Sequence, residues 1–151
     1  PGKTTRALGL ALRSVGRGLP VKFIMMMKGQ ETGELFSSPF DIEQFGSIDF
    51  VYEPDEEHMM NAQKALKSAI KAVGQSGIVV VDEFFDALSA GLIDDVDFQN
   101  LLSAKSDDVE LILTGRNAPK SYYPLADYVT EIHCVKHPFD KQIYARIGIE
   151  L

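Results

Sequence analysis

Short apolar runs alternate along the chain with longer segments in which apolar residues recur at helical spacing. The short runs are rich in β-branched residues and are partly bounded by glycine or aspartate, a pattern typical of β-strands. The strands are therefore expected at residues 21–28, 47–53, 77–83, 109–116 and 127–135. The three most central runs are apolar at successive positions, which indicates parallel strands covered by helices on both sides.

The segments between these runs have the apolar stripe of amphipathic helices. Asp55 is a suitable N-cap for the second of them, and Asp94 marks a break in the third. We expect the helices at about residues 3–15, 55–73 and 84–104. Strands and helices alternate without an internal repeat or a linker. The pattern thus predicts one domain over residues 1–151, with an α/β fold: a doubly wound, mostly parallel sheet with helices on both faces.

The composition restricts the classes of binding partner and the cellular compartment that we expect for the protein. A net charge of -7 argues against a broad nucleic-acid surface, which needs a surplus of lysine and arginine. No apolar run approaches the ~20 residues of a membrane span, so we expect no membrane partner. Cys134 is the single cysteine, which fits a reducing compartment, and we expect a cytoplasmic protein. The position of Cys134 in an expected strand favours a small core residue.

The first candidate site is the stretch Gly2, Lys3, Thr4 and Thr5, which opens the first expected helix. These residues match the end of a phosphate-binding loop: free backbone N–H groups at a helix start, a lysine charge, and a hydroxyl for Mg²⁺. A chance helix start with these residues is the alternative. Because such a loop follows a buried strand, we expect at least one strand and the first half of the loop before Pro1.

A second candidate lies at the end of the apolar run 77–83, where Asp82 and Glu83 reach the carboxyl edge of the sheet. Two carboxylates there can hold Mg²⁺ opposite the hydroxyl of Thr4, although a solvated pair of acids is also common at a strand end. The two motifs together favour a nucleotide site of RecA-like P-loop architecture. Arg116 ends another strand at the same edge, as a phosphate contact or as the partner of a carboxylate.

Aromatic and histidine residues offer weaker signals. Phe50 and Tyr52 share one face of an expected strand, either as core residues or as the wall of a flat pocket. The positions of His58, His133 and His137 do not match a metal-binding constellation.

In chain order, these motifs resemble the P-loop type of ATP:corrinoid adenosyltransferase, the cob(I)alamin adenosyltransferase family. The resemblance extends over essentially the whole chain, and its C-terminal part is the most specific. The stretches that carry it are "GKTTRALGLALRSVGRG", "MMMKGQETGE", "VVVDEFF" and "LILTGRNAPKSYYPLADYVTEIHCVKHPFDKQIYARIGIEL".

The resemblance implies that the Co(I) of a reduced corrinoid, a cobalamin or a related compound, attacks the 5′ carbon of ATP and releases triphosphate. It implies ATP contacts from Gly2, Lys3, Thr4, Thr5, Arg13 and Arg116, of which Lys3 would also act in catalysis. It further implies a Mg²⁺ site made by Thr4, Asp82 and Glu83.

For the corrinoid, the resemblance implies that Phe50 and Tyr52 press against the corrin face, with Tyr52 where the family has tryptophan. A reduced flavoprotein as electron donor and a homodimer are further family expectations. Two other functions remain open at this point. One is a P-loop ATPase or kinase, which would release inorganic phosphate or transfer it. The other is a carrier of nucleotide or corrinoid.

Overall fold

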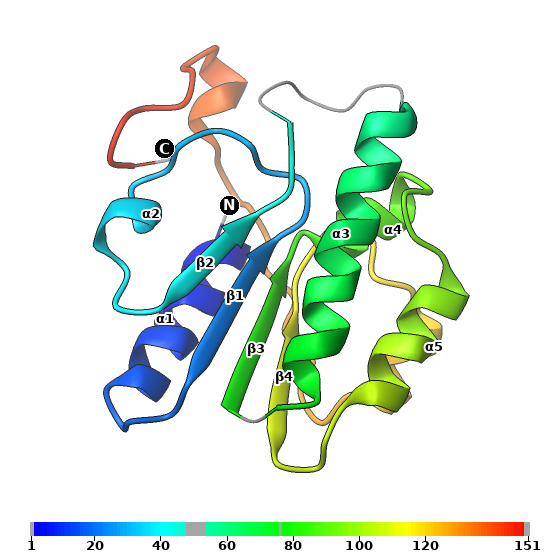
Figure 1. The fold of residues 1–151 in the computed structure, drawn as a ribbon. Helices are drawn as coiled ribbons and strands as arrows, with labels where there is room; N and C mark the ends of the chain where they lie inside the picture. Colours follow the sequence, from blue (N-terminus) through cyan, green and yellow to red (C-terminus); the bar gives the residue numbers. More distant parts are fainter. Residues whose placement is uncertain (1, 48–53, 76, 150–151) are drawn as a thin grey trace.

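Within the described residues, four parallel strands form one sheet in the order β2-β1-β3-β4 (Figure 1). The strands are β1 (Val21–Met25), β2 (Asp41–Gln44), β3 (Gly77–Asp82) and β4 (Val109–Leu113). This computed structural model describes residues 2–47, 54–75 and 77–149. The expected α/β class with a parallel sheet is confirmed.

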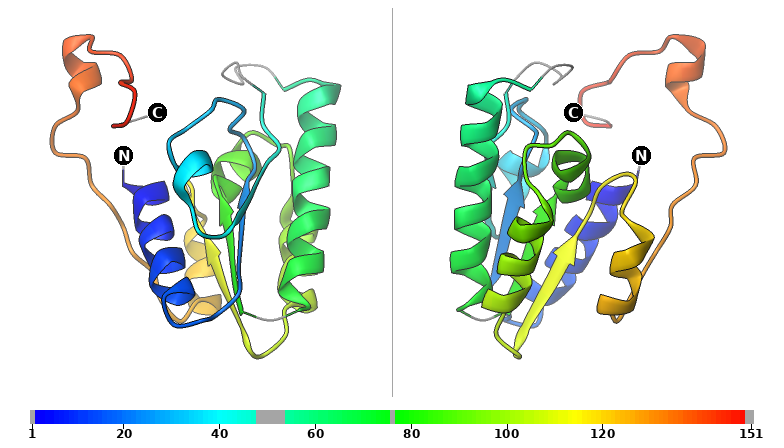
Figure 2. Two further views of the ribbon diagram at one scale, coloured as in Figure 1. Left: turned by 60° about the vertical axis from the view of Figure 1, so that its left-hand side comes forward. Right: turned by 90° about the vertical axis from the view of Figure 1, so that its right-hand side faces the viewer.

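Helices cover both faces of the sheet, as the apolar runs predicted. Helix α1 (Lys3–Val15) packs on one face, and α3 (Glu56–Val73) packs on the other together with α4 (Phe84–Ser89) and α5 (Asp95–Ala104) (Figure 2). The remaining elements are short: α2 (Glu34–Ser37) and the 3₁₀ helices η1 (Lys120–Leu125) and η2 (Pro138–Lys141). No helix in the described ranges combines the length and apolar character needed to cross a membrane.

The apolar runs of β1 and β3 supply both halves of the core because successive side chains point to opposite faces. Phe23 and Val80 pack with the α1 side chains, whereas Ile24 and Val81 pack with α3. All four of these side chains are fully buried. Burial on both faces fixes the position of β3, and with it the place where Asp82 emerges.

Two helices begin at an aspartate N-cap, of which that of Asp55 was predicted and that of Asp94 was expected only as a break. The side chain of Asp55 accepts a hydrogen bond from the backbone N–H of His58 at 2.9 Å and begins α3. The side chain of Asp94 accepts one from the N–H of Asp97 at 2.9 Å and begins α5. The expected helix over residues 84–104 is therefore two helices, divided at the predicted break.

The edge strand β2 was not predicted. It contains one strongly apolar residue, Ile42, and is defined by its backbone pairing with β1 and by ion pairs from Lys22 to Asp41 and Glu43. The strand expected at residues 47–53 lies outside the described residues except for Ser47, which belongs to no strand.

The strand expected at residues 127–135 is wrong. This segment has no strand structure and runs outside the packed layers (Figure 2). Tyr128 and Val135 are 85% and 90% exposed, and β4 pairs only with β3 among the described strands. The segment does not pair with β4 or with any other described strand, so its backbone groups have no partner in the sheet. The expectation that Cys134 lies in the core is wrong for the same reason, because its side chain is exposed.

Candidate functional site

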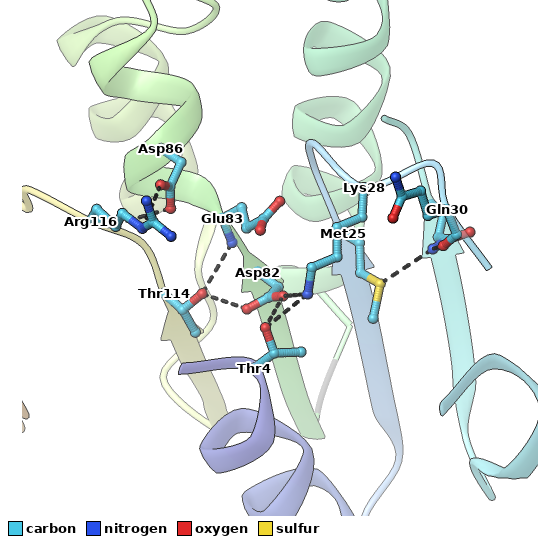
Figure 3. A network of polar contacts seen from close by, with 10 residues as sticks. Thr4, Met25, Lys28, Gln30, Asp82, Glu83, Asp86, Thr114 and Arg116 are labelled. Carbon is cyan, nitrogen blue, oxygen red and sulfur yellow. Dashed lines mark hydrogen bonds and ion pairs between the residues drawn. The ribbon is translucent and has the colours of Figure 1, made fainter. Parts of the chain in front are cut away.

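The carboxyl ends of β1, β3 and β4 meet at one edge of the sheet, beside the first turn of α1 (Figure 3). Gly2 precedes the helix with φ +95°, a conformation that glycine adopts without strain, and its carbonyl accepts the N–H of Arg6 at 3.0 Å. Lys3 and Thr4 therefore lie in the first turn, where backbone N–H groups lack partners within the helix. This arrangement favours an anion.

Asp82 is the centre of a polar cluster at this edge (Figure 3). Its Oδ2 accepts the hydroxyl of Thr4 at 2.8 Å and the ammonium of Lys28 at 3.1 Å. Its Oδ1 accepts the hydroxyl of Thr114 at 2.5 Å. Lys28 also donates to Thr4 Oγ1 at 2.9 Å. Three segments distant in sequence thus converge on this carboxylate.

The burial of Asp82 explains why it has so many partners. Its side chain is 0% exposed, and an ionised carboxylate in such surroundings requires a counter-charge and hydrogen-bond donors. Lys28, with its side chain 24% exposed, provides the charge. Sequence reasoning did not assign roles to Lys28 and Thr114. Both follow strands that end at this edge, and that position was the available signal.

Glu83 occupies a constrained position directly after Asp82. It has φ 63° and serves as the N-cap residue of α4, and its backbone N–H donates to Thr114 Oγ1 at 3.0 Å. Burial raises the pKa of the Glu83 carboxyl, and the nearby charges of Lys28 and Lys3 oppose that rise. The carboxylates of Asp82 and Asp86 add to the effect of burial, and the pKa of Glu83 is raised overall.

The loop after β4 packs tightly against the start of α4. Gly115 has φ +153°, and an added Cβ would stand 2.5 Å from the Cβ of Phe85 and 2.6 Å from its backbone nitrogen. Beyond it, the Arg116 N–H donates to Asp86 Oδ2 at 3.1 Å, and Arg116 Nε lies 3.9 Å from Asp86 Oδ1. Of the two roles considered for Arg116, the carboxylate partner is the one seen in this structure, with the side chain 74% exposed.

The other predicted site residues are not all brought together. Thr5 is on the first turn of α1 with an exposed side chain. Arg13 is exposed in the last turn, nine positions after Thr4, which is about 14 Å along the helix axis. The structure does not bring Arg13 to the Asp82 cluster. Phe50 and Tyr52 lie outside the described residues.

The cluster has the donors of a hard-cation site. Within the described ranges, no group of three or more histidine, cysteine, aspartate or glutamate side chains could hold a metal ion. The oxygens of Thr4 and Asp82 instead stand 2.8 Å apart. Two neighbouring ligands of an octahedral Mg²⁺ are separated by about 3 Å, since each lies 2.0–2.1 Å from the ion. Their spacing and their chemistry fit two adjacent ligands of Mg²⁺.

Comparisons with a family model and with individual proteins agree on one family. A model of the family described as ATP:corrinoid adenosyltransferase BtuR/CobO/CobP matches residues 1–151. A corrinoid adenosyltransferase of Sinorhizobium sp is 31% identical over 160 residues, covering 99% of this chain and 75% of that protein. Corrinoid adenosyltransferase CobA of Salmonella typhimurium is 31% identical over 162 residues, covering 99% of this chain and 80% of that protein. A corrinoid adenosyltransferase of Pseudomonas aeruginosa is 30% identical over 158 residues (99% and 78%).

Proposed function

Because the chain belongs to the ATP:corrinoid adenosyltransferase family, we propose that it transfers the 5′-deoxyadenosyl group of ATP to the cobalt of a reduced corrinoid. The reaction serves the synthesis or salvage of adenosylcobalamin. The structural observation that supports this proposal is the cluster of Thr4, Lys28 and Asp82 at the start of α1. It offers a place for a triphosphate and its counter-ion.

The proposed reaction is a nucleophilic substitution at carbon. The electron pair of Co(I) forms the Co–C5′ bond, and the C5′–O bond breaks. The triphosphate leaves with that bond's electrons, and the cobalt becomes formally Co(III). Because Co(I) is already a strong nucleophile, the protein has little proton transfer to perform. Its main tasks are to align the two reactants and to stabilise the charge of the leaving group.

We assign the triphosphate to the first turn of α1. The N–H groups after Gly2 and the ammonium of Lys3 would hold phosphate oxygens, with Thr5 beside them. The hydrogen bond from Thr4 to Asp82 places the first turn of α1, which includes Lys3, beside the end of β3. Contacts of ATP with Arg13 and Arg116 stay predictions. For Arg116, such a contact would replace its ion pair with Asp86.

We assign Mg²⁺ to Thr4 and Asp82, with Glu83 adjacent. The two oxygens in hydrogen-bond contact are hard donors of the kind that Mg²⁺ prefers. Bound Mg²⁺ would neutralise charge on the triphosphate oxygens. Phe50 and Tyr52 are proposed to contact the corrin face and to favour reduction of the cobalt.

We further propose a reduced flavoprotein as electron donor, a homodimer as the working state and the cytoplasm as location. The family resemblance supports the first two, and the presence of one cysteine in the sequence agrees with the third. Sedimentation velocity would measure the oligomeric state directly. A single boundary at the monomer mass would contradict the dimer.

An anaerobic assay tests the proposed reaction. The full-length protein is mixed with Mg-ATP and chemically reduced cob(I)alamin, and the visible spectrum and the phosphate products are followed. We expect the Co(I) absorption to decay to a light-sensitive alkylcobalamin while triphosphate accumulates. Unchanged cobalamin with release of ADP or inorganic phosphate would show instead a P-loop ATPase or kinase. Binding of both compounds without any product would show a carrier.

Two lysine variants make the assay specific to the proposed site. Lys3→Met removes an ammonium assigned to the triphosphate, and we expect about a 100-fold loss of kcat, comparable with the loss of one stabilising donor in other enzymes. Lys67→Met removes an exposed lysine in the middle of α3 and should retain wild-type activity. Equal rates for the two variants would contradict the role of Lys3.

A further inference from the structure

Lys28 occupies a defined position although it follows β1 in a loop. The loop is held from the other side, because the N–H of Gly46 donates to the carbonyl of Lys28 at 3.2 Å. An added Cβ at Gly29 would come within 2.5 Å of the backbone of Ser47, so the two loops are in close contact. The backbone of Lys28 is therefore fixed, and its side chain extends to Asp82 (Figure 3).

The ammonium of Lys28 bonds the same two oxygens that are assigned to the metal. It donates to Thr4 Oγ1 at 2.9 Å and to Asp82 Oδ2 at 3.1 Å, while these oxygens bond each other at 2.8 Å. A divalent cation on this pair of oxygens would stand next to a positive charge that bonds both of them. Coulomb repulsion disfavours that arrangement, most strongly where the carboxylate is fully buried.

The buried carboxylate nevertheless requires a cation at all times. Asp82 is 0% exposed, and loss of its counter-charge would leave an uncompensated charge in the interior. Lys28 and a divalent ion can satisfy this requirement in turn. The Lys28 side chain is 24% exposed, so it has access to solvent when it leaves Asp82.

We propose that Lys28 is a built-in counter-ion of Asp82 that exchanges with the divalent cation. In the nucleotide-free protein its ammonium neutralises Asp82, and it leaves Thr4 and Asp82 when the metal binds. Lys28 thereby lowers the affinity of the empty protein for the free metal ion. The proposal rests on the assignment of the metal to Thr4 and Asp82.

Mn²⁺ is a suitable probe because its free form is measured directly by electron paramagnetic resonance. Titration of the nucleotide-free full-length protein compares wild type with Lys28→Met and with Lys22→Met. Lys22 is the matched control, since it lies on β1, the strand that precedes the Lys28 loop, and pairs with Asp41 and Glu43 instead. We expect Lys28→Met to bind Mn²⁺ about tenfold or more tightly, because a like charge is removed from the site. Lys22→Met should keep wild-type affinity, and an unchanged or weaker affinity for Lys28→Met would overturn the proposal.

Wild-type protein gives a second readout that does not depend on the folding of a variant. The rate of acetylation of each lysine by acetic anhydride is measured by mass spectrometry with and without Mn²⁺. Release of Lys28 should raise its acetylation rate severalfold and leave that of Lys67 on α3 unchanged. An unchanged rate for Lys28 at saturating Mn²⁺ would show that the ion pair stays intact.

The Asp82→Asn change separates failure of this inference from failure of the metal assignment. In the Lys28→Met background, Asp82→Asn should weaken Mn²⁺ binding strongly. If it does so while Lys28→Met alone has no effect, the metal site stands and the exchange is refuted. If Asp82→Asn has no effect on Mn²⁺ affinity, the metal assignment itself is wrong, and the exchange fails with it.

Discussion

Thr114 illustrates how strongly the site depends on single hydroxyl groups. Its Oγ1 donates to Asp82 Oδ1 at 2.5 Å and accepts the N–H of Glu83 at 3.0 Å. We predict that Thr114→Val, which keeps the side-chain shape, lowers the free energy of unfolding by about 1–3 kcal/mol, because both partners lose a bond away from water. Urea denaturation followed by circular dichroism measures this difference.

Thr114→Ser is the matched control because it keeps the hydroxyl and removes only a methyl group. We expect it to lie much closer to wild type than Thr114→Val. If the two variants lose the same stability, the methyl group and not the hydrogen bonds would account for the effect.

At the residue scale, the sequence predicted two members of the Asp82 cluster but not the residues that join them to the neighbouring strands. Thr4 and Asp82 were predicted from local motifs, and the structure places their oxygens in contact. The roles of Lys28 and Thr114 were not predicted, because they arise from the order of strands in the sheet. That order brings together residues separated by 54 and 32 positions from Asp82. No local pattern encodes such a pairing.

At the element scale, the glycine after β4 fixes how the strand meets α4. We predict that Gly115→Ala lowers the free energy of unfolding by about 1–3 kcal/mol, since φ +153° is unfavourable for alanine. In addition, its Cβ would clash with the backbone of Phe85. Thermal unfolding would detect the loss as a lower Tm.

At Gly9, the same change from glycine to alanine is expected to raise stability instead of lowering it. It lies inside α1, and an added Cβ would meet nothing within 4 Å. Gly9→Ala should therefore raise stability by about 0.5–1 kcal/mol through better helix propensity. A destabilising Gly9→Ala would mean that this face of α1 is covered in solution.

Tyr122 packs η1 against α5, and the stability that this contact contributes depends on pH. Its ring stacks on Phe98 with centroids 4.1 Å apart, and its hydroxyl donates to the carboxylate of Asp95. Burial, together with the bond to Asp95, raises the pKa of Tyr122 from 10.0 to about 12. Because the folded state favours the neutral phenol, this stabilisation is present below pH 10 and is lost as the pH rises through 12.

We therefore predict that wild type loses more stability between pH 10 and pH 12 than Tyr122→Phe does. Urea denaturation at a series of pH values measures the two slopes. Tyr128→Phe changes a phenol that is 85% exposed and should retain the wild-type slope. Parallel slopes for wild type and Tyr122→Phe would contradict the assigned cause.

The errors in the expected elements have two physical origins. Strand β2 has a weak apolar pattern, because it is an edge strand whose position depends on backbone pairing and on the ion pairs of Lys22. Residues 127–135 have a strong strand pattern, but they pair with none of the described strands. Propensity describes what a segment can form, whereas pairing decides whether it does so.

At the scale of the whole molecule, the pattern of apolar residues was sufficient to predict a sheet with a layer of helices on each face. The two-sided runs of β1 and β3 predicted a sheet between helices, and burial of both faces confirms it. The C-terminal segment of residues 127–149 behaves differently, because its side chains are predominantly exposed and only η2 interrupts its irregular backbone. The molecule thus combines a packed layer structure with an extended surface segment.

This contrast predicts where a protease cuts first. Cleavage requires several residues to adopt an extended conformation, which costs little in an exposed irregular segment and requires local unfolding within a helix. Lys136 lies in the exposed segment, whereas Lys64 and Lys67 are exposed lysines inside α3. Limited trypsin digestion followed by mass spectrometry should show cleavage after Lys136 about tenfold or more faster than after either α3 lysine. First cuts within α3 would mean that the C-terminal segment is covered in solution and that α3 opens more readily than its buried alanine face implies.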